Sequence, residues 1–79
     1  MQTQAISGTL SHDKGLIHRI TTRLRSRSGR SITDFRIQIE EHGLVLWGRT
    51  HTYYSKQLAQ MVAVEVSGLP IVANKIEVI

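Results

Sequence analysis

The chain has 79 residues, no cysteine and a net charge of +4, and 41% of its residues are hydrophobic. A chain of this length forms one small domain that buries only roughly 60% of its unfolded surface, which leaves little room for a deep active site. Without cysteine there are no disulfides, no thiolate catalysis and no Cys-based zinc site. The positive charge favours acidic partners, namely nucleic acid, an anionic membrane surface or an acidic protein.

The N-terminal part of the chain divides into a lead and a first helix. Residues 1–10 are polar and non-periodic, so we expect a flexible lead before a domain that covers residues 11–79. Ser11 is a good N-cap, and the first helix is expected to run from there to about residue 26. Its apolar stripe has helical spacing and consists of Leu16, Ile17, Ile20 and Leu24.

Two strands are expected next. Residues 32–40 alternate between apolar and polar side chains, which is typical of a strand with one buried face and one wet face. A short turn then leads into Gly43–Thr50, the most apolar run, which returns antiparallel as the second arm of a hairpin. Its two faces differ: one carries Leu44, Leu46 and Gly48, and the other carries Val45, Trp47 and Arg49.

A second helix and a last strand complete the chain. Thr52 can cap a helix from Tyr53 to about residue 66, and Gly68 followed by Pro70 is a helix-stop signal. Residues 71–79 read as a strand. The order helix, strand, strand, helix, strand predicts an α+β two-layer sandwich, with both helices on one face of a three-stranded mixed sheet. A right-handed crossover makes residues 43–50 the central strand.

Glycines are expected to set the backbone at three positions. Gly43 is assigned to the hairpin turn, Gly48 to a close approach of the central strand to a helix, and Gly68 to the helix stop.

This pattern resembles the BON domain, a small α-β-β-α-β module of bacterial envelope and osmotic-stress proteins. The resemblance covers about residues 17–78 and is carried by apolar positions and glycines: Phe35, Ile37, Ile39, Gly43, Leu44, Leu46, Gly48, Ala59, Val66, Gly68, Leu69, Val72, Asn74, Ile76 and Val78. The segment between Gly43 and Gly48 is one residue shorter than is usual in the family. The stretch from Gly48 to Gln60 is similar to a planctomycete-type branch.

The resemblance implies a non-catalytic module that binds anionic phospholipid or protein partners and uses no cofactor. Most BON domains belong to secreted or membrane-attached proteins. Here the first ten residues lack the basic and apolar regions of a signal peptide, and no segment reaches the roughly 20 apolar residues that cross a bilayer. We therefore expect a cytoplasmic location for the chain as written, and an envelope location if it is part of a longer protein.

A row of arginines is the first candidate binding site. Arg19, Arg23 and Arg27 recur every four residues beside the apolar stripe of the first helix, and Arg30 follows. Arginine stems can lie over apolar surface while the guanidinium groups reach phosphates, so this row suits an anionic surface. The alternative is an ordinary solvated helix face.

The second candidate is the face formed by Val45, Trp47 and Arg49. If both helices cover the opposite face of the sheet, the only tryptophan lies on an open surface. Such a residue can mark a site for a protein partner or a second copy of the chain. Two alternatives are that residues 1–10 fold over Trp47, and that Trp47 is simply exposed.

Other chemistries have weaker support. The four histidines do not have the spacing of a metal site, and the serines and Tyr53-Tyr54 lack the partners that catalysis requires. We therefore expect no enzyme and no metal site. The alternative function is a small basic nucleic-acid-binding protein, although the Gly-x-x-Gly loop of the KH module and the paired aromatics of RNA-stacking sheets are absent.

Overall fold

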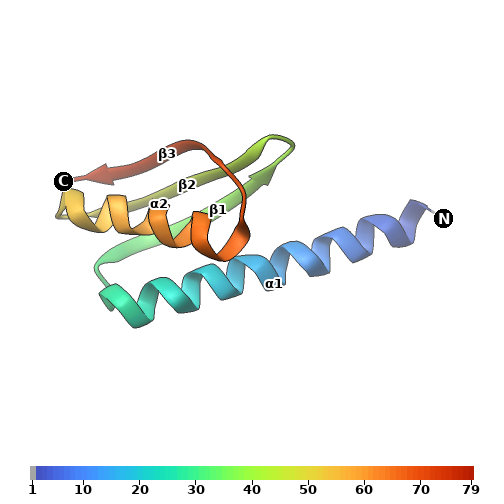
Figure 1. Cartoon of the computed structure of the whole chain (residues 1–79), viewed down its shortest axis with the longest axis horizontal. Coiled ribbons are helices and arrows are strands. Elements are labelled where there is room, and N and C mark those ends of the chain that lie inside the picture. Colours follow the sequence, from blue (N-terminus) through green and yellow to red (C-terminus); the bar gives the residue numbers. More distant parts are fainter. Residues whose placement is uncertain (1) are drawn as a thin grey trace.

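A computed structural model describes the backbone of residues 2–79 and the side chains of residues 13–79. The elements are α1 (Gln2–Ser28), β1 (Ile32–Glu40), β2 (Gly43–Thr50), α2 (Tyr53–Ser67) and β3 (Ile71–Val78). The two helices pack on one face of the three-stranded sheet (Figure 1). The α+β class and the predicted order of elements are therefore confirmed.

The sheet has the order β1-β2-β3, so the central strand is β2 as predicted. β1 pairs with β2 antiparallel, and β2 pairs with β3 parallel through the crossover helix α2. In this register Leu46 lies between Ile37 on β1 and Asn74 on β3, whereas Trp47 lies between Arg36 and Lys75. The two faces of β2 therefore meet different sets of neighbours.

The core lies between the helices and one face of the sheet. Apolar side chains of this kind each contribute about 1.5–3 kcal/mol when they are fully buried. The predicted stripes of both helices supply most of them, together with the inward residues of the strands. The buried cluster consists of Leu16, Ile20, Leu24, Ile37, Leu44, Leu46, Leu58, Ala59, Val62, Ala63 and Ile76.

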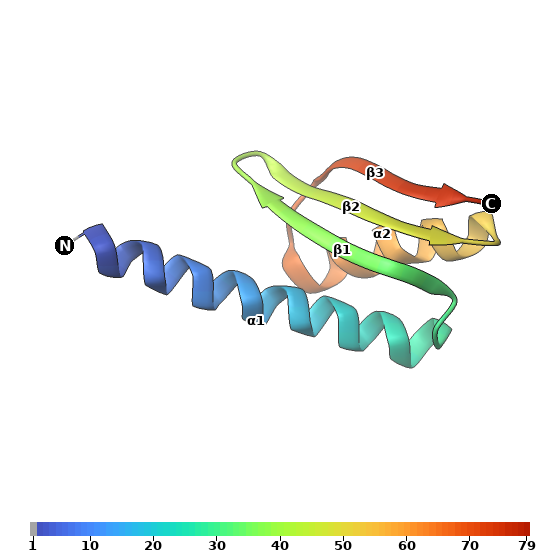
Figure 2. The ribbon, with the colours of Figure 1, turned by 180° about the vertical axis from the view of Figure 1, so that it is seen from behind.

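The first helix begins earlier than predicted. Residues 1–10 were expected to form a flexible lead, but α1 starts at Gln2 and extends beyond the end of the sheet (Figure 2). No proline interrupts this stretch, so Ser11 lies within the helix rather than at its start. No helix within the described residues combines the length and the apolar character that crossing a membrane requires.

A bulge in β1 turns its first residues. The register shifts between Thr33 and Arg36, and Asp34 has a positive φ of 54°. Because of this shift, Ile32 and Phe35 both pack against the core although they are three residues apart. Asp34 is directed to the opposite face of the sheet, where its carboxylate meets Arg49.

Both ends of α2 are capped, and a side chain of β3 holds its first half. The Thr52 side chain accepts a hydrogen bond from the Ser55 amide at 3.1 Å, and Gly68 ends the helix in the left-handed region with φ 72°. Asn74 on β3 donates to the carbonyl of Lys56 at 3.1 Å and to the side chain of Gln60 at 3.2 Å. The predicted caps are confirmed, and Asn74 ties α2 to the sheet.

Gly43 and Gly48 sit where the backbone leaves no room for a side chain. A Cβ at Gly43, where φ is 147°, would overlap the carbonyl oxygen of Pro70, which accepts a hydrogen bond from Leu44 at 2.9 Å. A Cβ at Gly48 would lie 2.9 Å from Cγ2 of Ile32. The close approach predicted at Gly48 is therefore to β1 and not to a helix, because the bulge brings Ile32 across it.

We expect opposite effects from alanine at two of the glycines. Gly15 lies in α1 with no neighbouring atom within 4 Å of an added Cβ, so Gly15→Ala should raise the free energy of unfolding by about 0.5–1 kcal/mol. Gly43→Ala should lower it by about 1–3 kcal/mol or more, because the added group strains the backbone and collides with Pro70. Urea unfolding followed by circular dichroism measures both. Equal effects would contradict the close approach of Gly43 to Pro70.

Candidate functional site

The arginine row of α1 lies along the groove between the two helices. Arg19 and Arg23 are exposed and line this groove together with His18, Thr22, Ser26 and Glu65. Arg27 donates to Oε1 of Glu65 on α2 at 3.0 Å. Among residues 13–79, neither Arg19 nor Arg23 has a carboxylate within ion-pair distance. We call Arg19, Arg23 and Arg27 the α1 basic face.

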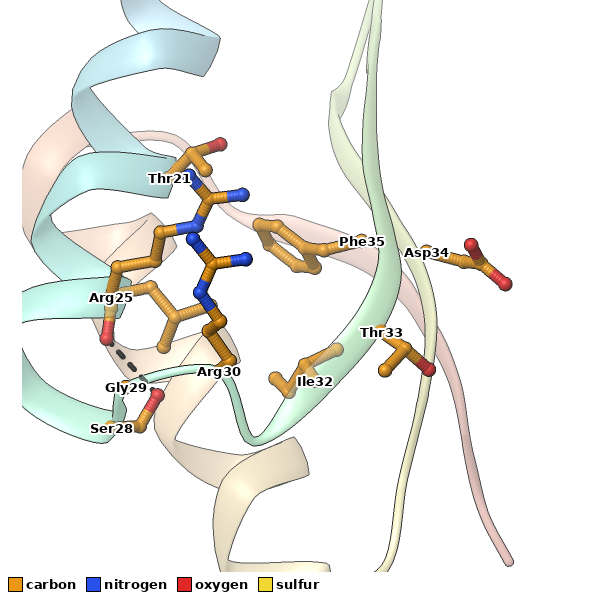
Figure 3. A pocket seen from close by; sticks show the side chains of 10 residues that line it. Thr21, Arg25, Ser28, Gly29, Arg30, Ile32, Thr33, Asp34 and Phe35 are labelled. Carbon is orange, nitrogen blue, oxygen red and sulfur yellow. Dashed lines mark hydrogen bonds between the residues drawn. The ribbon is translucent and has the colours of Figure 1, made fainter.

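Arg30 is not part of this face, although it was predicted together with the row. Gly29 ends α1 with φ 66°, and its amide donates to the carbonyl of Arg25 at 2.8 Å. This left-handed residue changes the chain direction, and Arg30 lines the same pocket as Arg25 (Figure 3). The four predicted arginines therefore belong to two separate places on the surface.

Arg25 and Arg30 border a pocket between the end of α1 and the start of β1. Its volume is about 280 Å³, and its walls include Thr21, Leu24 and Phe35. Arg25 was not predicted as a site residue, because it lies midway between Arg23 and Arg27 and therefore does not share their four-residue spacing. The sequence did contain a signal for this arrangement. Gly29 is a helix-stop residue, and it lies between Arg25 and Arg30, so a turn of the chain at Gly29 can bring both arginines to the same end of the helix.

On the opposite face of the sheet, Trp47 is half-buried between two cations. The guanidinium carbon of Arg36 lies 5.7 Å from the ring centroid, and Nζ of Lys75 lies 4.8 Å from it. These residues come from the two neighbouring strands and occupy the same row as Trp47. Residues 2–10 do not fold over Trp47, because α1 carries them away beyond the sheet (Figures 1 and 2).

The other two residues of the predicted partner face are less available than expected. Val45 was assigned to an open surface, but it is only 5% exposed. Its short side chain lies between Gln38 and Ala73 and beside the larger Trp47, so its neighbours on the sheet cover it. Arg49 is exposed, but it donates to Oδ2 of Asp34 at 2.8 Å. Trp47 with Arg36 and Lys75 therefore forms the accessible centre of this face.

The comparisons and the search for metal-binding groups add no further candidate site. Within residues 13–79, no three histidine, aspartate or glutamate side chains lie close enough together to hold a metal ion. The chain was also compared with protein-family models, with curated proteins and with solved structures, and none of them matches it. The candidate sites therefore rest on the geometry described above.

Leu46 and Trp47 are adjacent in sequence but should differ in their contribution to stability. Leu46 is fully buried, so Leu46→Ala should lower the free energy of unfolding by about 2–5 kcal/mol. Trp47→Ala should cost about 1–2 kcal/mol, since it removes two cation–π contacts of about 0.5–1 kcal/mol each from a half-exposed site. Urea titration of both variants provides the measurement. A loss for Trp47 as large as that for Leu46 would mean that a second molecule covers this face.

Proposed function

We propose that the protein is a non-catalytic binding module that docks on anionic surfaces, foremost a phospholipid bilayer, through its α1 basic face. The observation that supports this most directly is that Arg19 and Arg23 are exposed and form no ion pair with any of the described side chains. Each basic residue close to an anionic leaflet contributes about 1 kcal/mol to binding. Two or three such residues give a weak, reversible attachment.

Arg27 can join this interaction at low cost. Its ion pair with Glu65 is exposed on both sides, with 40% and 49% of the side-chain surfaces accessible to solvent. Ion pairs in such surroundings contribute only about 0–1 kcal/mol to stability. A lipid phosphate can therefore replace Glu65 as the partner of Arg27 without a large loss of folding free energy.

The outer side of the helix layer also offers apolar and amphipathic side chains. Tyr53, Tyr54, Met61 and Val64 of α2 are all exposed, by between 41% and 71%. Tyrosine suits the boundary between water and acyl chains because its ring is apolar and its hydroxyl remains hydrated. Basic residues on α1 and such residues on α2 are the combination that interfacial membrane binding uses.

The resemblance to the BON domain supports the same function, since that family is associated with anionic phospholipid and protein partners. We favour a lipid surface over nucleic acid because Arg36 and Lys75 already lie over the Trp47 ring. Stacking of a nucleic-acid base on this ring would have to displace them. A protein partner or a second copy at the Trp47 face would be a separate interaction.

Sedimentation with lipid vesicles tests the proposal. The wild-type protein should bind vesicles that contain phosphatidylglycerol and not vesicles of phosphatidylcholine alone. The double variant Arg19→Gln/Arg23→Gln should bind roughly 30-fold more weakly, because it loses two contributions of about 1 kcal/mol each. The matched control is Arg36→Gln/Lys75→Gln, which removes the same charge from the sheet face and should retain the wild-type affinity.

Two results would count against the proposal. If wild-type protein fails to sediment with anionic vesicles at low salt, the protein does not bind such surfaces. If both double variants lose the same affinity, net charge drives binding and the α1 basic face has no special role. Circular dichroism of both variants checks that the fold is retained.

A further inference from the structure

We infer that the pocket between α1 and β1 binds a small phosphate monoester, through the paired guanidinium groups of Arg25 and Arg30. This site is separate from the α1 basic face and does not depend on the proposed membrane function. In Figure 3 both guanidinium groups turn into the space between the helix and the strand, on the helix side of the Phe35 ring, and both residues line this one pocket.

The positive charges of Arg25 and Arg30 are not neutralised by acidic side chains in this pocket. Of the described side chains, Asp34 is the only acidic one that lines it, and its carboxylate points away from the two arginines and pairs with Arg49 at 2.8 Å. Among residues 13–79, no ion pair involves Arg25 or Arg30. Two positive charges that border one pocket repel each other, and an anion bound between them is attracted by both.

The hydroxyl groups of the pocket walls near the helix end already donate hydrogen bonds to backbone carbonyls. Thr21 donates to the carbonyl of Ile17 at 2.8 Å, and Ser28 donates to the carbonyl of Leu24 at 3.0 Å. The side-chain hydrogen-bond donors left for a ligand near the helix end are therefore the guanidinium groups. Guanidinium groups bind phosphate through two parallel N–H···O bonds, which makes a pair of them suitable for one phosphoryl group.

The charge of the two arginines and the volume of the pocket indicate which class of ligand fits. A phosphate monoester carries a charge of about −1.5 to −2 at pH 7, which matches two guanidinium groups better than a carboxylate or a phosphodiester does. The apolar part of the walls comes from Leu24, Ile32 and Phe35. A pocket of about 280 Å³ admits the phosphoryl group with one ring or a short aliphatic group, and it is small for a drug-sized ligand.

A purely structural role for these arginines makes a different prediction. Arg25 lies in the last turn of α1, where a positive charge stabilises the negative end of the helix dipole. That role needs no ligand and does not require Arg30. The ligand site, in contrast, requires both side chains at once, so the two explanations are distinguished by titration of single and double variants.

Phenyl phosphate is a suitable soluble probe, and titration followed by amide NMR locates the site. Amide shifts should cluster at residues 28–35 and saturate at millimolar concentrations. Arg25→Gln and Arg30→Gln should each weaken binding about tenfold, since each removes a charge-assisted contact, and the double variant should not saturate. The matched control Arg19→Gln/Arg23→Gln removes the same charge from α1 and should retain the wild-type affinity.

Two further probes identify the source of the phosphoryl group. Inorganic phosphate should bind more weakly than phenyl phosphate because it leaves the Phe35 side of the pocket empty. Vesicles that contain phosphatidic acid should compete with phenyl phosphate if a lipid monoester reaches the pocket, and should not compete if the ligand is soluble. Vesicles of phosphatidylglycerol, a diester, should not compete at this site in either case.

The proposal is overturned if phenyl phosphate causes no saturating shifts, or if the control variant weakens binding as much as Arg25→Gln/Arg30→Gln does. It is also overturned if the shifts centre on Arg19 and Arg23 rather than on residues 24–35, where most of the pocket lining lies. None of these results bears on vesicle binding through Arg19 and Arg23, and a failure of vesicle binding leaves the phenyl phosphate titration unaffected.

Discussion

The whole structure depends on the burial of the central strand. Leu44 and Leu46 are fully buried under the helices, Val45 is buried on the other side, and β2 is hydrogen-bonded to a neighbour along both edges. The buried residues of both helices belong to one cluster with Leu44 and Leu46. Once β2 is fixed, the bulge in β1 and the parallel pairing of β3 determine which side chains lie next to each other on each face.

The two faces of the molecule differ in how many of their positive side chains have partners within the chain. On the sheet face, Arg49 pairs with Asp34, while Arg36 and Lys75 lie against Trp47. These positive charges are engaged within the chain. On the helix layer, the exposed Glu65 forms an ion pair with Arg27, which is one of the three arginines of the α1 basic face. The composition gives the chain a net charge of +4. The positive side chains that remain available for ligands lie mainly along α1 and at its C-terminal end.

Local signals in the sequence were sufficient for much of the fold. Alternation in β1 and the caps at Thr52 and Gly68 each depend on residues a few positions apart, and these predictions are confirmed. The start of α1 was predicted wrongly because Ser11 has the features of a cap but sits inside a longer helix. The cations around Trp47 and the shared pocket of Arg25 and Arg30 were not predicted, since they follow from strand register and from the direction of the chain after Gly29.

The mixed pairing of the sheet also has a consequence for the order in which the chain folds. β1 and β2 are joined by a two-residue turn, with Glu40 opposite Gly43, so their contacts are local and close a very short loop. The parallel partner of Leu44 is Ile71, and all of α2 lies between them. Non-local pairings form more slowly than local ones. The hairpin should therefore form early, and the docking of α2 with β3 should limit the folding rate.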